Sequence, residues 1–196
     1  VSNKSMEREL PYSEREINCM HEKINIAREA VNRVVERDVI LLDASTTAWQ
    51  MARLLPDMRI TVLTNAMKVA LELAERSKIK VIFTGGTLSA PSLSFIGPLA
   101  EKTLQEYHVN KLFFSCKGVD LDRGLSDSNE SHALLKRCMM TIADQSYLLA
   151  DHTKFGVKAL TMFSPLKDLH EIITDVKLDS TINEQLTSLN MKVSKV

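Results

Sequence analysis

The sequence predicts an α/β fold of the Rossmann-like kind, in which helices cover both faces of a mostly parallel sheet. Two observations support this prediction. Short segments that are apolar at nearly every position recur along the chain, and segments with helical periodicity lie between them. Because a strand without a polar face must be covered on both sides, such segments are typical of a parallel sheet.

The predicted strands are short and rich in β-branched or aromatic residues. The first, VILLDA, leads into a run of hydroxyl residues, and the fourth, KLFFSC, carries two aromatic residues. Six strands are expected, over residues 39–44, 60–65, 80–86, 111–116, 146–151 and 171–175.

The predicted helices alternate with these strands. Over residues 20–36, apolar residues such as Ile24, Ala27 and Val31 recur at helical spacing while Lys23 falls on another face, which indicates an amphipathic first helix. Four further helices are expected, over residues 46–55, 66–75, 98–107 and 130–144.

One main domain accounts for the length and composition of the chain. With 196 residues, of which 44% are hydrophobic, it can bury one sizeable core. The opening residues are polar and are interrupted by Pro11, so residues 1–16 are expected to be a linker and residues 17–196 the folded domain. Since the chain begins with Val1 rather than methionine, we expect another segment to precede the linker.

Charge and cysteine usage restrict the function. The 25 basic and 25 acidic residues balance, so this chain lacks the basic footprint of a nucleic-acid binder. No apolar run approaches the roughly 20 residues of a membrane span, and the polar start does not resemble a signal peptide, which indicates a cytoplasmic protein. Cys19, Cys116 and Cys138 are widely spaced, so neither a disulfide framework nor a metal site is expected, and no cofactor is implied.

Three consecutive hydroxyl residues, Ser45, Thr46 and Thr47, follow the first predicted strand at the expected start of a helix. In an open α/β sheet, ligands bind beyond the carboxyl ends of the strands. Free N–H groups at a helix N-terminus favour anions, phosphate especially. The stretch is therefore a candidate phosphate loop; the alternative is an ordinary N-cap, because serine and threonine are favoured there in any helix.

Polar residues follow the other predicted strands as well. Singly, they are explained by helix caps, a tight turn or an Asx turn. Gathered at one edge of the sheet, they resemble a pocket in which hydroxyl and N–H groups hold a phosphate, lysine balances its charge, and acidic and amide groups bind sugar hydroxyls. The residues concerned are Thr64, Asn65, Gly85, Gly86, Lys117, Asp120, Asn129, Glu130, Asp151 and Lys154.

Five stretches resemble, in order and spacing, the effector-sensing domain of DeoR-family transcriptional regulators. They are EKINIAREAVNRVVERDVILLDASTTAWQMARLLPD, ITVLTNAMKVALEL, VIFTGGTL, FFSCKGVDLDRGLSDSNE and LLADHTKFG, and the resemblance spans about residues 12–175. It implies a fold similar to that of sugar-phosphate isomerases and CoA transferases. It also implies a winged helix-turn-helix ahead of this domain that contacts operator DNA, and a homo-oligomer whose DNA affinity changes when a phosphorylated sugar binds.

The resemblance implies which residues form the site, and it includes two departures from the usual family pattern. Ser45 stands where glycine is usual, and Lys117 stands in a segment that is usually less basic, so both bear on the choice of ligand. The implied phosphate loop is Asp43, Ser45, Thr46 and Thr47, with Thr64, Asn65, Gly85 and Gly86 at the mouth and Lys117, Asp120, Asn129, Glu130 and Lys154 on the sugar side.

Within the family, the stretches LDASTTAW, LPD, FSCKGVD and SDSN are most similar to regulators of L-fucose and L-rhamnose use. The expected effector is therefore a ketose 1-phosphate such as L-rhamnulose 1-phosphate or L-fuculose 1-phosphate. For a homo-oligomer, the first helix and the tail INEQLTSLNMKV are candidate contacts.

Two other functions fit the sequence. A sugar-phosphate isomerase needs a general base to move a proton between adjacent carbons, and Asp120 or Glu130 is a candidate. A linker ahead of the domain has no evident role in such an enzyme, and His108, His132 and His152 form no metal-ligand pair at helical spacing. The other alternative is an assembly module with a vestigial pocket.

Overall fold

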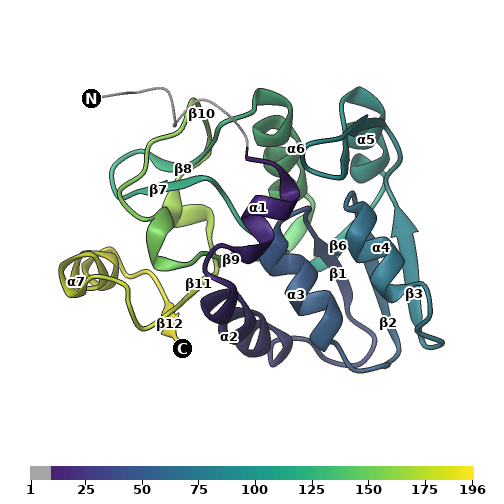
Figure 1. The fold of residues 1–196 in the computed structure, drawn as a ribbon, viewed down its shortest axis with the longest axis horizontal. Helices are drawn as coiled ribbons and strands as arrows, with labels where there is room; N and C mark the ends of the chain where they lie inside the picture. Colours follow the sequence, from purple (N-terminus) through teal and green to yellow (C-terminus); the bar gives the residue numbers. More distant parts are fainter. Residues whose placement is uncertain (1–9) are drawn as a thin grey trace.

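The computed structural model describes residues 10–196 and contains a seven-stranded sheet in which every pair of neighbouring strands is parallel. Its strand order is β12-β11-β9-β6-β1-β2-β3, and helices pack on it in the layered arrangement of Figure 1, which confirms the predicted α/β fold. The strands are β1 (Val39–Leu42), β2 (Ile60–Thr64), β3 (Ile79–Phe83), β6 (Val109–Phe114), β9 (Ala143–Leu149), β11 (Glu171–Thr174) and β12 (Val193–Lys195).

Two hydrophobic clusters cover the two faces of this sheet. Along β1, Ile40 and Leu42 pack into one cluster and Leu41 into the other, because successive side chains of a strand point to opposite faces. The first cluster includes residues of α2 (Met20–Val31), α3 (Thr46–Leu54) and α4 (Met67–Leu73). The second includes residues of α5 (Pro98–Gln105), α6 (Glu130–Thr141) and α7 (Ser180–Ser188).

The predicted elements are present, but some of their ends differ. The first helix ends at Val31, short of residue 36, and α6 ends at Thr141 because β9 already begins at Ala143, which pairs with Val109. Ala143 and Gln145 are only partly buried and Asp144 is exposed, so this segment lacks the apolar signal of a central strand. The edge strand β12 was not predicted, because Val193 is its only apolar residue.

Small antiparallel elements lie outside the main sheet and were not predicted as strands. The strands β4 (Thr87–Ser89) and β5 (Ser94–Ile96) form a hairpin, while β8 (Gly124–Asp127) pairs with both β7 (Gly118–Asp120) and β10 (Thr161–Ser164). They have three or four residues each and are rich in glycine, serine, threonine and aspartate, which are weak strand formers apart from threonine. Two 3₁₀ turns, His152–Lys154 and Leu166–Asp168, complete this region.

Part of the expected linker is packed on the domain. Residues 1–9 lie outside the described residues, but Tyr12–Ile17 form a short helix, α1, and Tyr12 is buried. Figure 1 shows α1 in front of the sheet, beside α3. Among the described residues, no helix is long and apolar enough to cross a membrane.

Candidate functional site

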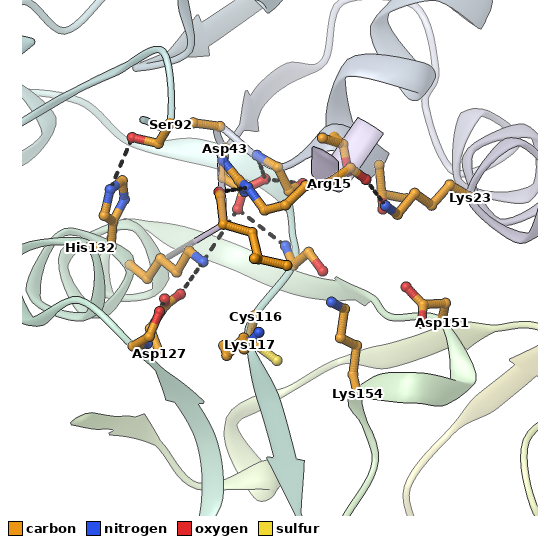
Figure 2. A pocket seen from close by; sticks show the side chains of 18 of the residues that line it. Arg15, Lys23, Asp43, Ser92, Cys116, Lys117, Asp127, His132, Asp151 and Lys154 are labelled. Carbon is orange, nitrogen blue, oxygen red and sulfur yellow. Dashed lines mark hydrogen bonds and ion pairs between the residues drawn. The ribbon is translucent and has the colours of Figure 1, made fainter. Parts of the chain in front are cut away.

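A cavity of about 360 Å³ lies beyond the carboxyl ends of β1, β2, β6 and β9. Helices α1, α2 and α6 complete its walls, and Figure 2 shows their side chains converging on it. The strand-end argument therefore locates a real hollow in the structure. Eight of the predicted residues line it: Asp43, Ser45, Thr46, Thr47, Asn65, Lys117, Asp151 and Lys154.

The loop from β1 to α3 is held in place by Asp43. Its Oδ1 accepts hydrogen bonds from the backbone N–H of Ser45 (3.1 Å) and from the Ser45 hydroxyl (2.6 Å), and its Oδ2 accepts from the N–H of Ser115 (3.2 Å). Burial raises the pKa of Asp43, and the ammonium of Lys136 together with these hydrogen bonds opposes that rise. Asp43 thus orders the loop by fixing the ends of two neighbouring strands to each other.

The N-terminus of α3 faces the cavity with donors available. Ser45 caps the helix, because its hydroxyl accepts from the N–H of Ala48 at 3.1 Å. Thr46 and Thr47 occupy the first helical positions, where N–H groups have no acceptor within the helix, and no described residue accepts from them. The structure therefore shows the predicted cap, and this cap leaves the two N–H groups available to an anion.

Three lysines without an ion-pair partner among the described residues line the same cavity as this end of α3. Lys117 and Lys154 line the cavity, and neither ammonium group has a hydrogen bond or ion pair with a described residue. Burial lowers the pKa of Lys117, and the charge of Lys154 lowers it further. Lys23 of α2 is buried, and burial lowers its pKa to about 8. An anion in the cavity would relieve this concentration of positive charge.

A further lysine, Lys136 of α6, forms a buried ion pair in the wall. Its Nζ lies 2.6 Å from Asp127 Oδ2 and 3.7 Å from Asp43 Oδ2. Burial alone would raise the pKa of Asp127, but Lys136 holds it below the ordinary value. One turn earlier on α6, His132 Nε2 lies 3.1 Å from the Ser92 hydroxyl, and burial lowers the pKa of His132 to about 4. The imidazole is therefore neutral near pH 7.

Asn65 offers an acceptor on another wall. Its Nδ2 donates to the carbonyl of Phe95 at 3.0 Å, which fixes the amide, while its Oδ1 is buried and accepts no hydrogen bond from a described residue. Buried amide oxygens nearly always find a donor. A ligand hydroxyl group in the cavity would supply one.

Six predicted site residues do not line the cavity. Thr64 donates to the carbonyl of Leu42 inside the sheet, Gly85 and Gly86 follow the edge strand β3, and Asp120 closes an Asx turn by accepting from the N–H groups of Asp122 and Arg123. The side chain of Asn129 caps α6, and Glu130 is exposed. We correct their assignment: these residues belong to the sheet, turns and helix start around the cavity and do not line it.

The structure adds residues that the strand-end argument missed. They come from helices α1, α2 and α6, from the turn between β4 and β5, from the residues that directly follow β6, and from β8 and the residue after it. The helices carry no local sequence signal of a ligand site; the spacing of His132 and Lys136, four residues apart on one helix face, is the nearest to such a signal. The main additions are Arg15, Lys23, Ser92, Ser115, Cys116, Asp127, Ser128, His132 and Lys136. Among the described residues, no group of three or more His, Cys, Asp and Glu is arranged to hold a metal ion.

The open parallel sheet and the position of its cavity place the chain in a class of α/β domains whose pocket lies beyond the carboxyl ends of the strands. Ribose 5-phosphate isomerase A from Methanocaldococcus jannaschii shares this fold, with a TM-score of 0.52 over 70% of this chain and 55% of that one, at 18% identity.

The chain belongs to the DeoR family, because the pattern that defines the DeoR C-terminal sensor domain matches residues 18–176. It is 50% identical over its whole length to an uncharacterized HTH-type transcriptional regulator of Bacillus subtilis, YulB, and covers 76% of that protein. It is 40% identical over 162 residues to the L-fucose operon activator of Haemophilus influenzae, a match that covers 83% of this chain and 65% of the activator.

Proposed function

We propose that this domain senses a phosphorylated sugar and so controls DNA binding by a cytoplasmic DeoR-family regulator of carbohydrate catabolism. The main support for this proposal is the positive charge of the side chains that line the cavity. Five cationic side chains and three acidic ones line it, and two of the cations, Lys117 and Lys154, have no ion pair with a described residue. Such a site suits a phosphate monoester, whose charge is about −1.5 to −2 at pH 7. The charged side chains are Arg15, Lys23, Lys117, Lys136 and Lys154, and Asp43, Asp127 and Asp151.

The phosphate group fits best at the N-terminus of α3. The N–H groups of Thr46 and Thr47 have no described acceptor there, and the helix dipole favours an anion. Lys117 and Lys154 line the same cavity without a described counter-ion. Lys136 is less available to bind the phosphate, because its ammonium group already pairs with Asp127.

The rest of the cavity suits a sugar. The free Oδ1 of Asn65 accepts from a hydroxyl group, whereas Leu135, Met139 and Val157 provide apolar surface against which a deoxygenated carbon packs. The similarity to an L-fucose operon activator points the same way. We therefore propose a ketose 1-phosphate such as L-fuculose 1-phosphate or L-rhamnulose 1-phosphate as the effector.

Isomerisation is less well supported than sensing. A general base must reach the proton it removes, and the two candidates, Asp120 and Glu130, do not line the cavity. The acidic groups that do line it have other partners: Asp43 holds the β1 to α3 loop, Asp127 pairs with Lys136, and Asp151 accepts from the N–H of Thr153. We propose that the domain binds the sugar phosphate without converting it.

A thermal-shift screen tests the proposal. The panel contains ketose 1-phosphates, aldose phosphates, the matching free sugars and inorganic phosphate. A true effector at about 100 times its dissociation constant stabilises the fold by roughly 2.7 kcal/mol, and its free sugar does not. If no phosphorylated sugar raises the melting temperature, the sensor proposal fails and the vestigial-pocket alternative gains support.

Matched variants assign the effect to the site. Thr46→Val and Thr47→Val together should reduce the ligand-induced shift, because they remove two hydroxyl groups from the site while keeping the backbone N–H groups. Thr187→Val, at an exposed position on α7, should leave the shift unchanged. A turnover assay with the ligand that binds separates the two classes of function. Conversion of that ligand to an isomer would overturn the non-enzymatic proposal.

Partners follow from the same proposal. The chain covers only 65–76% of the two relatives described above, and operator DNA would be contacted by a segment outside this domain. A homo-oligomer is expected, and light scattering of the purified chain with and without the ligand measures it.

A further inference from the structure

Helix α1 and the turn that follows it form one wall of the cavity. Leu10 precedes the helix, Arg15 lies within it, and Asn18 and Cys19 follow it; all four line the cavity. Figure 2 shows Arg15 on the side of the cavity opposite Asp127, close to the loop that carries Asp43. A ligand that fills the cavity therefore touches this helix.

The backbone of α1 is joined to the candidate phosphate site through one atom. The carbonyl oxygen of Arg15 accepts a hydrogen bond from the ammonium of Lys23 and another, at 3.4 Å, from the hydroxyl of Thr46. Both donors line the cavity, and Thr46 is the first residue of α3. A change in the contacts of either donor therefore changes how α1 is held.

The other side of α1 rests on a small aromatic and ionic contact. The ring of Tyr12 meets the ring of Trp49 edge to face, with centroids 6.5 Å apart, and the ammonium of Lys68 lies over both rings, 4.6 Å and 4.4 Å from their centroids. Lys68 also forms an ion pair with Glu16 at 2.8 Å. These contacts, and the hydrogen bond from the N–H of Tyr12 to the carbonyl of Pro91, dock the helix.

This docking is of limited strength. A helix of six residues is too short to persist without tertiary contacts. The Tyr12 hydroxyl is buried without a hydrogen bond to any described residue, which weakens the docked state. Cys19, between α1 and α2, has a φ of +53°, a conformation that side-chain-bearing residues rarely adopt. A bound ligand can therefore change the equilibrium between docked and undocked α1 by a measurable amount.

We propose that α1 is a strap over the effector cavity and that binding of a sugar phosphate stabilises its docked position. The proposal rests on the proposed function, because it takes the phosphate to lie against Thr46 and Arg15. Ligand binding and strap docking are then linked, and the linkage is reciprocal: the ligand favours docking of α1 by the same factor by which docking raises the ligand affinity. In the full regulator, the strap lies at the N-terminal side of the sensor, where a DNA-binding segment would be connected.

The chain contains its own reporter of strap docking. Trp49 is the only tryptophan in the sequence, it contacts Tyr12, and it does not line the cavity. Tryptophan emission therefore responds to α1 rather than to direct contact with the ligand. Hydrogen exchange of residues 12–17 gives a second readout that needs no substitution.

The experiment uses the 196-residue chain and the compound of the phosphate panel that binds, with inorganic phosphate as a second probe. We expect saturating ligand to alter Trp49 emission and to slow exchange over residues 12–17 by about tenfold. Tyr12→Ala should weaken ligand affinity by about tenfold. Ile17→Ala, on the same helix but 67% exposed, should change it less than about twofold.

The outcomes separate this inference from the proposed function. Binding with unchanged or faster exchange over residues 12–17 overturns the strap and leaves the sensor intact. Equal affinity of the Tyr12→Ala variant and the unmodified chain, with both folded by circular dichroism, overturns it as well. If no phosphorylated compound of the panel binds, both proposals fall together.

Discussion

The ammonium of Lys136 lies 2.6 Å from Asp127 and 3.7 Å from Asp43. One lysine of α6 therefore joins a carboxylate at the end of β8 to a carboxylate directly after β1. All three side chains are largely removed from water: that of Asp43 is 2% exposed, and those of Asp127 and Lys136 are 12% exposed. Breaking a buried ion pair leaves an uncompensated charge, which costs far more than breaking a pair in solvent.

The first prediction follows from this ion pair. Lys136→Met should lower the free energy of unfolding by about 3 kcal/mol, because Asp43 and Asp127 lose their common cation. Lys158→Met removes the partner of Asp120, but Lys158 is 56% exposed, so this control should cost less than about 1 kcal/mol. Urea denaturation measures both. Equal losses of unfolding free energy in the two variants would show that burial of the Lys136 ion pair adds nothing to its contribution to stability.

The second prediction concerns Glu171, at the opposite end of the sheet. Burial alone would raise its pKa, but Arg33 at 2.7 Å, Ser194 and Lys192 outweigh this and lower the pKa from 4.5 to about 2. A carboxyl whose pKa is lower in the folded state stabilises the fold above about pH 4.5, and that stabilisation is lost as the pH falls toward 2.

The stability difference between the unmodified chain and Glu171→Gln should therefore shrink by about 2 kcal/mol between pH 6 and pH 3. Urea denaturation at the two pH values provides the measurement. The unmodified chain and Glu171→Gln are compared with each other at the same pH, so that the titration of their other carboxyl groups largely cancels. A difference that does not change with pH would contradict the role given to Glu171.

The third prediction concerns the pH dependence of ligand affinity. Burial lowers the pKa of Lys23 to about 8, so its positive charge is lost as the pH rises through 8. Affinity for a sugar phosphate should fall between pH 7 and pH 9, by at most about tenfold for each pH unit above 8. Calorimetric titration at pH 7, 8 and 9 measures this slope.

Lys23→Met should flatten that slope, whereas Lys102→Met, on the exposed surface of α5, should preserve it. A slope that persists in Lys23→Met would assign the titration to another group. The ammonium of Lys23 would then serve only to hold the carbonyl of Arg15.

The fourth prediction tests the corrected role of the two glycines after β3. A Cβ at Gly86 would lie 2.7 Å from the carbonyl oxygen of Ile96, at a φ of +116°, so Gly86→Ala should cost about 3 kcal/mol of stability. Gly85 has open space around it and a φ of +66°, so Gly85→Ala should cost about 1 kcal/mol. Thermal denaturation ranks the two variants.

Ligand affinity completes that test. Because neither glycine lines the cavity, Gly85→Ala should bind the effector within about twofold of the unmodified chain. A large loss of affinity would return Gly85 to the mouth of the site, where the sequence had suggested it.

The strand-end argument identified cavity-lining residues where strands lie near the middle of the sheet. Residues after β1, β2, β6 and β9 line the cavity, since parallel strands bring their carboxyl ends to one edge. It failed for Gly85 and Gly86, because β3 is the edge strand and its end lies away from the centre. It failed also for Asp120, whose segment proved to be an antiparallel hairpin with its own turn.

The sequence by itself determined the parallel α/β sheet, most of its strands and helices, and the polar loop that opens α3. These depend on apolar runs, helical periodicity and caps, which are properties of contiguous residues. Only the tertiary structure decided that Arg15, Lys23, His132 and Lys136 share a cavity with that loop. Their side chains reach it because of the way helices pack on the sheet, and that depends on contacts between residues far apart in the chain.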